Sequence, residues 1–113
     1  MLVFCVNDGA VMDAWGRDQG IEKSKGFVKF MADPSGAATR ALDIALTHPG
    51  PASKGLLHRC KRTATYFEDG VVKFHSVAEG PDDPAGDARP EATCAEALLE
   101  AVASVNPLKK VEL

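Results

Sequence analysis

The sequence lacks the charge excess and the long apolar runs that mark several large classes of protein. Its 113 residues carry 13 Lys and Arg against 16 Asp and Glu, a net charge of −3. Duplex nucleic acids are bound largely by neutralising their phosphates, so this mildly acidic chain is not expected to bind nucleic acid. The longest apolar run, Met1 to Val6, is far shorter than the roughly 20 residues of a membrane-spanning helix. We therefore expect one globular domain over residues 1–113, with neither nucleic acid nor membrane as a partner.

Cysteine is scarce, and its spacing excludes two common uses of this residue. The three cysteines, Cys5, Cys60 and Cys94, form no C-x-x-C pair, and an odd, widely spaced set suits neither a disulfide framework nor a zinc site. His48 and His75 have no cysteine at ligand spacing, and no phosphate loop or dinucleotide fingerprint occurs. We therefore expect no metal and no cofactor. Free thiols, together with a start that has no basic segment ahead of its apolar residues, indicate a reducing, cytoplasmic location.

The first third of the chain has the pattern of a β-strand, a helix and a second strand. Leu2–Val6 is a continuous β-rich run, typical of a strand covered on both faces. Asn7 and Asp8 are candidate helix caps. The helix that follows places Val11, Met12 and Trp15 on one face, and Phe27–Met31 forms the second strand. Such a unit predicts two parallel strands with a right-handed crossover, and hence an α/β protein.

A second helix and a β-hairpin are predicted next. The helix has one face formed by Ala38, Ala41, Leu42 and Ala45, and it is expected to stop before the prolines of residues 48–51. Asp69-Gly70 is a strong hairpin turn signal between two β-rich runs, Thr63–Phe67 and Val71–Val77. A two-residue turn there places Phe67 opposite Val72, and Thr65 opposite Phe74.

The C-terminal part combines an acidic loop with a helix that starts near a cysteine. Glu79–Ala92 is rich in proline, glycine and acids and predicts a mobile loop without regular structure. Thr93 and Glu96 form a capping box, which opens a helix expected to end at Asn106-Pro107. Cys94 is then the first helical residue, where the helix dipole favours a thiolate. The alternative is a small residue that merely begins the helix.

The other two cysteines differ in their surroundings. Cys60 lies in the basic cluster His58–Arg62, whose cations lower a thiol pKa or hold an anion such as a phosphorylated metabolite. The alternative is a solvated strand edge protected by charge. Cys5 lies inside the apolar first strand and is interpreted as an inert core thiol.

Four segments, in order along the chain, resemble the type-five, or type II atypical two-cysteine, branch of the peroxiredoxins. V-N-D-G-A-V-M-D-A-W-G at Val6–Gly16 is similar to the strand-to-helix segment of that family. F-M-A-D-P-S-G at Phe30–Gly36 resembles its strand ending in A-D-P-x-G. The hairpin K-R-T-A-T-Y-F-E-D-G-V-V-K at Lys61–Lys73 and the late T-C at Thr93-Cys94 match two further family segments.

The resemblance implies a thioredoxin-like fold, with a central sheet flanked by helices, and a thiol peroxidase activity. In this family a peroxidatic thiolate reduces hydrogen peroxide or an alkyl hydroperoxide, a resolving thiol forms a disulfide with it, and thioredoxin or a glutaredoxin restores both. The matched positions imply that Arg62 stabilises the thiolate and polarises the peroxide. They imply that Cys94 is the resolving cysteine of the animal-type members. Cys5 is the weaker alternative, because it lies two residues nearer to V-N-D than the resolving cysteine of plant-type members.

The peroxidatic motif of the family, P-x-x-x-T-x-x-C, does not occur in the 113 residues. In the family it lies ahead of the strand with which this chain begins, so the chain resembles the C-terminal two-thirds of a peroxiredoxin domain, truncated at its N-terminus. We expect an exposed apolar edge beside Leu2–Val6, relieved by homodimerisation. Two functions remain open: a peroxidase by descent, and a non-enzymatic redoxin-fold module that pairs with a full-length peroxiredoxin.

Overall fold

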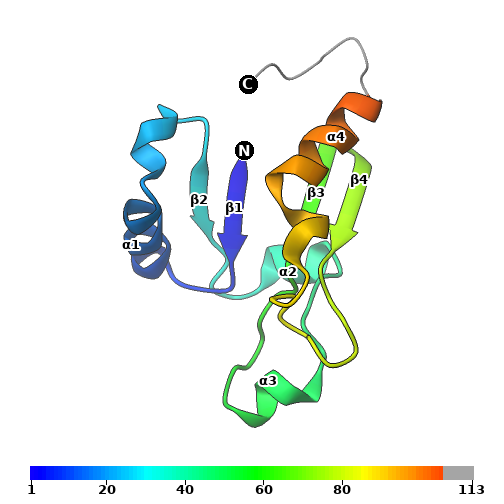
Figure 1. Ribbon diagram of the computed structural model, residues 1–113. Coiled ribbons are helices and arrows are strands. Elements are labelled where there is room, and N and C mark those ends of the chain that lie inside the picture. The colour runs from blue at the N-terminus through cyan, green and yellow to red at the C-terminus, as the bar shows by residue number, and fades with distance from the viewer. Residues whose placement is uncertain (106–113) are drawn as a thin grey trace. The chain divides into compact units, whose positions relative to one another are not determined.

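The structure, a computed structural model, describes residues 1–105 and divides the chain into two compact units. The first unit is Met1–Cys60 and the second is Lys61–Leu113. Figure 1 shows strands and helices in both units, which is the mixed α/β class expected from the sequence. The four described strands form two sheets of two strands each, β1 (Leu2–Cys5) with β2 (Lys29–Ala32) and β3 (Thr63–Glu68) with β4 (Val71–Val77).

The first unit contains the predicted strand–helix–strand arrangement. β1 (Leu2–Cys5) and β2 (Lys29–Ala32) pair in parallel, and α1 (Gly9–Gln19) connects them and packs on β2 (Figure 1). Asp8 is the N-cap, because its Oδ1 accepts the Val11 N–H at 2.8 Å. The ring of Trp15 packs edge-on against Phe30 with 4.6 Å between the ring centroids. The parallel pairing confirms one prediction, and of the two candidate caps, Asn7 and Asp8, the structure has Asp8 in that role.

The sheet of the first unit is less covered than the sequence suggested. Leu2 of β1 is 66% exposed and Met31 of β2 is 51% exposed, whereas Met12 of α1 is only 1% exposed. The prediction that the first strand is covered on both faces is therefore wrong for the described residues. The physical reason is that β1 has one paired neighbour, β2, and α1 packs on one side of this two-stranded sheet.

Short helices connect the rest of the first unit, and two of them differ from expectation. A 3₁₀ helix, η1 (Ile21–Ser24), follows α1, and α2 (Ala37–Ala41) follows β2. The predicted second helix was expected to include Ala45, but α2 ends at Ala41. The backbone at Asp43 is left-handed, with φ of 56°, and a right-handed helix cannot continue through it. A further helix, α3 (Pro49–Ser53), begins at the prolines that were expected only to end one. Proline is tolerated in the first turn because the N–H it lacks has no partner there.

The second unit contains the predicted hairpin with one change of register. β3 (Thr63–Glu68) and β4 (Val71–Val77) are antiparallel, and Phe67 faces Val72 as predicted. Asp69 and Gly70 have φ of 51° and 76°, as a turn with two left-handed residues requires. A β-bulge between Tyr66 and Phe67 places Thr65 opposite His75 rather than Phe74, so that prediction is wrong. Thr65 Oγ1 and His75 Nδ1 share a hydrogen bond of 2.8 Å.

The last described helix, α4 (Ala95–Val105), packs on both strands of the hairpin (Figure 1). Before it, η2 (Pro90–Thr93) forms a 3₁₀ turn inside the segment that was expected to lack regular structure. The predicted capping box does not form, because Thr93 ends η2 and α4 begins only at Ala95; the Thr93 hydroxyl donates to the Pro90 carbonyl at 3.0 Å. Cys94 instead precedes the helix, and its carbonyl accepts the Leu98 N–H. The predicted end at residues 106–107 lies outside the described residues.

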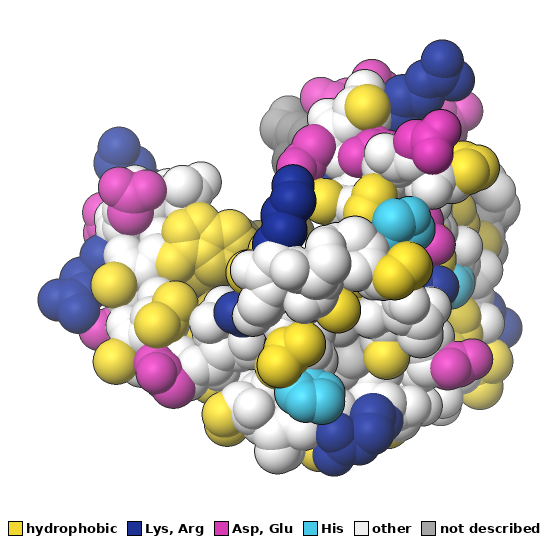
Figure 2. Space-filling model, turned by 90° about the horizontal axis from the view of Figure 1, so that it is seen from below, with side chains coloured by type: hydrophobic (Ala, Val, Ile, Leu, Met, Phe, Trp, Pro, Cys, Tyr) yellow, Lys and Arg dark blue, Asp and Glu magenta, His cyan; other side chains and the backbone are white. Residues whose placement is uncertain are grey.

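Apolar side chains at the surface are numerous in both units, and Figure 2 shows many of them on the face it draws. The large exposed ones include Leu2, Phe27 and Met31 in the first unit, and Phe67, Val71 and Val72 in the second. Large apolar side chains exposed in groups are typical of surfaces that contact another molecule.

The Asp8 cap of α1 provides a test of the first unit. Asp8→Ala removes the acceptor of the Val11 N–H, so we expect the free energy of unfolding to fall by about 0.5–2 kcal/mol. Urea denaturation followed by far-ultraviolet circular dichroism measures the change. The control is Asp18→Ala, an exposed position in the last turn of the same helix, where the change should stay within about 0.5 kcal/mol. Equal effects of the two substitutions would show that the cap does not stabilise α1.

Candidate redox site

Two of the three cysteines meet in the first unit. Cys5 is the last residue of β1, and Cys60 lies beside it in a segment that bridges to Ala45. The two side chains share a hydrogen bond, and the Val6 N–H also donates to the Cys60 sulfur. Neither cysteine forms a disulfide, and both are half-buried. The arrangement is a dithiol at the carboxyl end of a parallel strand.

Arg59 fixes the Cys60 segment against the junction between β1 and α1. Its Nη1 donates to the Val6 carbonyl at 3.0 Å and to Asn7 Oδ1 at 3.4 Å. Its carbonyl accepts the Leu46 N–H at 2.8 Å. Arg59 Nε is buried and has no hydrogen-bond partner among the described residues. The guanidinium therefore contributes positive charge close to the dithiol.

The hydrogen bond between the two thiols shifts their pKa values in opposite directions. The Cys5 thiol donates to the Cys60 sulfur, which lowers the pKa of Cys60 to about 6. Burial and the charge of Asp33 oppose that shift, whereas the N–H groups of Val6 and Cys60 support it. The same hydrogen bond and burial raise the pKa of Cys5, which the charge of Arg59 only partly offsets. Cys60 is therefore the thiolate of the pair and Cys5 its proton donor.

Two expectations about these cysteines need correction. Cys5 was interpreted as an inert core thiol, but it is half-buried and hydrogen-bonded to Cys60. The basic cluster was expected to lower the pKa of Cys60, yet the largest cause is the hydrogen bond from Cys5. No local pattern in the sequence joins residues 5 and 60, because their contact depends on the path of the chain between them.

Asp33, in the matched A-D-P-S-G segment, organises the loop that follows β2. Its carboxylate accepts the N–H groups of Ala38 and Thr39 at 3.1 and 2.9 Å, and the Thr39 hydroxyl at 2.8 Å. Desolvation opposes ionisation of this carboxyl, but the hydrogen bonds from Thr39 and Ala38 outweigh it and lower its pKa. Asp33 thus has a structural role at the start of α2, and its N–H donates to the Cys5 carbonyl at 3.0 Å.

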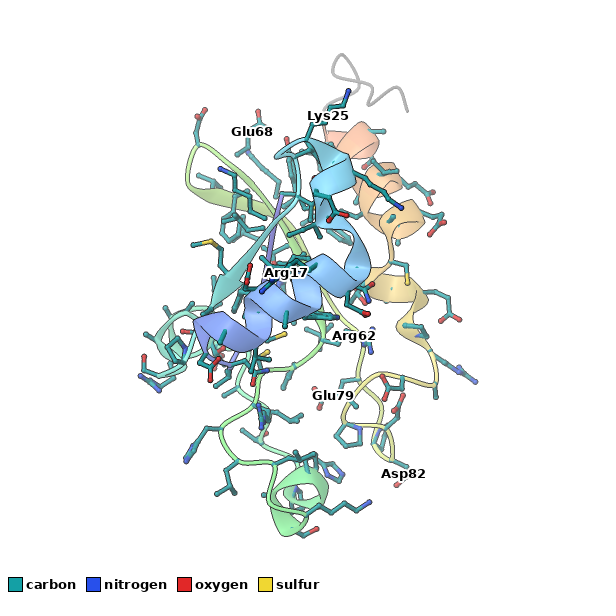
Figure 3. All side chains as sticks on the ribbon, turned by 90° about the vertical axis from the view of Figure 1, so that its left-hand side faces the viewer. Arg17, Lys25, Arg62, Glu68, Glu79 and Asp82 are labelled. Atoms are coloured by element: carbon teal, nitrogen blue, oxygen red, sulfur yellow. The ribbon has the colours of Figure 1, made fainter. Side chains whose placement is uncertain are left out.

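Arg62 lies in the second unit, at the base of the loop that carries Glu79 and Asp82 (Figure 3). Its Nη2 forms an ion pair with Asp87 at 2.6 Å, and its Nε donates to the Ala85 carbonyl at 3.2 Å. Lys61 pairs with Glu79 at 3.2 Å. Lys61 and Arg62 each form an ion pair with an acidic side chain. This pairing does not favour the alternative in which the basic cluster holds an anion.

The loop that Arg62 contacts is held by many hydrogen bonds. Asp83 accepts the N–H groups of Asp87 and Ala88 at 3.2 and 3.0 Å. Gly86, with φ of 73°, approaches the end of the hairpin so closely that a Cβ would lie 1.7 Å from the Ala78 carbonyl oxygen. These contacts set the path of the acidic loop along the second unit.

Cys94 is exposed, and its Sγ donates to the Pro90 carbonyl at 3.3 Å. It precedes α4 instead of being its first residue. Of the predicted site residues, Arg62 and Cys94 therefore lie in the second unit, at the two ends of the acidic loop, and Cys5 lies in the first. Within residues 1–105, no three His, Cys, Asp or Glu side chains gather as metal ligands. No helix in the same residues is long and apolar enough to cross a membrane.

Two curated proteins of Arabidopsis thaliana are similar to this chain in sequence. Chloroplastic Peroxiredoxin-2E is 37% identical over 76 residues, which are 66% of this chain and 30% of that protein. Peroxiredoxin-2B is 38% identical over 80 residues, which are 71% of this chain and 46% of that protein. The chain thus spans less than half the length of these relatives. No protein-family model matches it.

Two solved structures are similar to this chain in fold. The crystal structure of reduced Prx3 in complex with H2O2 from Vibrio vulnificus matches 96% of this chain and 56% of its own, with 27% identity and a TM-score of 0.67. An X-ray structure from Burkholderia cenocepacia, provisionally named a thioredoxin reductase, matches 75% of this chain and 49% of its own, with 37% identity and a TM-score of 0.60. The chain is therefore a mixed α/β protein of thioredoxin-like fold. Within that class, the similarities in sequence and structure point to the peroxiredoxins.

The protonation of Cys60 predicts how its reactivity depends on pH. An ordinary cysteine has a pKa of about 8.5, whereas Cys60 should ionise to the thiolate as the pH rises through about 6. We expect alkylation of Cys60 by iodoacetamide, followed by peptide mass spectrometry, to be half-maximal near that pH. Cys5→Ala removes the donor and should move the midpoint upward, because the thiolate loses its main stabilising contact. Cys5→Ser, which keeps a hydroxyl donor, is the matched control and should stay closer to the wild type. A wild-type midpoint near pH 8 or above would contradict this assignment.

Proposed function

We propose that this chain is part of a peroxiredoxin-type thiol peroxidase of the type-five, or type II atypical two-cysteine, branch. Its reaction is the reduction of hydrogen peroxide and alkyl hydroperoxides. The observation that carries the proposal is the parallel β1–α1–β2 unit, whose V-N-D-G junction lies in a chain 27% identical to Prx3 in complex with H2O2. The similarity to two peroxiredoxins of Arabidopsis thaliana supports it independently.

In this proposal the 113 residues supply the supporting groups of the reaction. The attacking thiolate comes from a P-x-x-x-T-x-x-C segment, which these residues do not contain. Arg62 stabilises that thiolate and the charge that develops on the peroxide oxygen, a role that suits a planar group with several N–H donors. Asp87 and the Ala85 carbonyl orient its guanidinium.

The second half of the reaction needs a resolving thiol, and we assign it to Cys94. Its sulfur is exposed and lies at the end of the acidic loop. It attacks the sulfenic acid of the peroxidatic cysteine, a disulfide forms, and water leaves. Cys5 is the weaker alternative, because its thiol is half-buried and hydrogen-bonded to Cys60. Thioredoxin or a glutaredoxin then reduces the disulfide. We place the protein in the reducing cytoplasm, as a homodimer that covers part of the exposed apolar surface.

A chimera tests the role of Arg62. The segment of Peroxiredoxin-2B that precedes its matched region is joined ahead of Met1, and turnover of hydrogen peroxide is measured with thioredoxin, its reductase and NADPH. We expect turnover by the chimera and near-background turnover by the 113 residues alone. Arg62→Ala should lower kcat/KM about 10²–10³-fold, since one preorganised donor to a developing oxyanion contributes about that much.

The matched control for this assay is Arg40→Ala. Arg40 is also an arginine with an exposed side chain, and its Nη1 donates to the Ser35 carbonyl at 2.7 Å, so turnover should not change. A chimera that folds by circular dichroism but shows no turnover, or turnover independent of Arg62, would overturn the proposal.

A second candidate is a non-enzymatic module that pairs with a full-length peroxiredoxin. The exposed apolar side chains of both units favour it, because such surfaces are typical of contacts with another chain. The exposed Cys94 thiol offers a covalent link to the partner.

Mixing the chain with purified full-length Peroxiredoxin-2B tests this candidate. If the module function holds, a complex should appear in size-exclusion chromatography, with a disulfide-linked fraction that disappears on reduction and in Cys94→Ser. Elution of the two proteins as separate species at tens of micromolar, with or without reductant, would exclude the candidate.

A further inference from the structure

We propose that Cys5 and Cys60 form a redox centre of their own, a dithiol that hydrogen peroxide converts into an intramolecular disulfide within the first unit. This proposal goes beyond the proposed function, because it uses neither Arg62 nor Cys94. It also needs no residue outside the described part of the chain.

The two sulfur atoms are brought together by backbone contacts on both sides. Pairing with Ala32 of β2 holds Cys5, and its carbonyl also accepts the Asn7 and Asp33 N–H groups at 2.8 and 3.0 Å. Cys60 is held by its bridge to Ala45 and by the Val6 N–H that donates to its sulfur. Two thiols already in hydrogen-bond contact need only a short movement to reach a bonded S–S separation of about 2 Å. The pair is thus preorganised for a disulfide.

The hydrogen bond also assigns the order of the two steps. Cys60 is the thiolate and attacks one peroxide oxygen, the O–O bond breaks, and the leaving hydroxide takes a proton to become water. The sulfur of Cys60 is then a sulfenic acid. The Cys5 sulfur attacks it, the S–O bond breaks, and the hydroxide leaves with the proton of Cys5 as a second water. In total, two thiols and one hydrogen peroxide give one disulfide and two waters, so two electrons pass from sulfur to oxygen.

Arg59 is the charged group that assists this centre. The Val6 carbonyl and Asn7 hold its guanidinium, and its buried Nε has no partner among the described residues. Its charge favours the thiolate of Cys5, which is the form that attacks the sulfenic acid. The acidic group near the pair is Asp33, whose charge disfavours the Cys60 thiolate, but its carboxylate is occupied by Thr39 and Ala38. Arg59 thus offsets part of the cost of ionising Cys5 in the second step.

The test is a stoichiometric oxidation without thioredoxin, so its outcome is independent of the coupled peroxidase assay. The reduced chain is treated with one equivalent of hydrogen peroxide, its free thiols are counted, and a protease that separates residues 5 and 60 is used for non-reducing peptide mapping. We expect two of the three thiols to be lost and one disulfide to join Cys5 to Cys60. Cys94→Ser should show the same disulfide. A disulfide that contains Cys94, or one between two chains, would overturn the proposal.

Two variants test the order of the steps. Cys5→Ser should accumulate a sulfenic acid on Cys60, trapped by dimedone, because the resolving thiol is gone. Cys60→Ser should slow thiol loss at least about tenfold at about pH 5.5, because an ordinary thiol is almost entirely protonated there. Thiol loss in Cys60→Ser as fast as in the wild type, or a sulfenic acid found on Cys5 instead, would contradict the assignment.

Discussion

The parallel pairing of β1 with β2 is the interaction on which the first unit depends. It brings Cys5, at the end of one strand, next to Asp33, just beyond the end of the other. Ligand and catalytic groups in open α/β sheets lie at this carboxyl edge, and both the matched V-N-D and A-D-P segments reach it here. Without this pairing, the junction that Arg59 contacts would have no fixed position, and Cys60 would have no partner thiol.

The charge on the Cys60 thiolate and the charge on the Arg62 guanidinium are stabilised in different ways. In the first unit the hydrogen bond between the thiols is the largest cause that lowers the pKa of Cys60 and raises the pKa of Cys5. In the second unit the Arg62 guanidinium is oriented by an ion pair and a backbone carbonyl of the acidic loop. A charge held in place before a reaction costs no reorganisation when the reaction occurs. The acidic loop therefore matters for how Arg62 is presented, as well as for the path of the chain to Cys94.

Several differences between expectation and structure arise where a local signal competes with a nearby alternative. The Thr93 hydroxyl was expected to accept an N–H of the following helix, but Thr93 is the last residue of η2, and its hydroxyl donates to the Pro90 carbonyl at 3.0 Å. The prolines after His48 predict only the end of a helix, yet they begin α3, because the N–H groups of the first turn have no partner within the helix. The bulge beside Phe67 keeps the predicted turn but shifts the register beyond it. In each case, contacts with neighbouring groups changed the structure that the local sequence pattern predicted.

The sequence by itself determined the order of the four strands and of the helices α1, α2 and α4, the parallel pairing and the Asp69-Gly70 turn, because these follow from periodicity and backbone preference over a few residues. It also carried the peroxiredoxin resemblance, since that rests on ordered segments. Only the tertiary structure decided that Cys60 meets Cys5, that Arg59 faces the β1–α1 junction and that Arg62 faces the acidic loop. These contacts join residues 23 to 55 positions apart, and no local preference specifies the path of the chain between them.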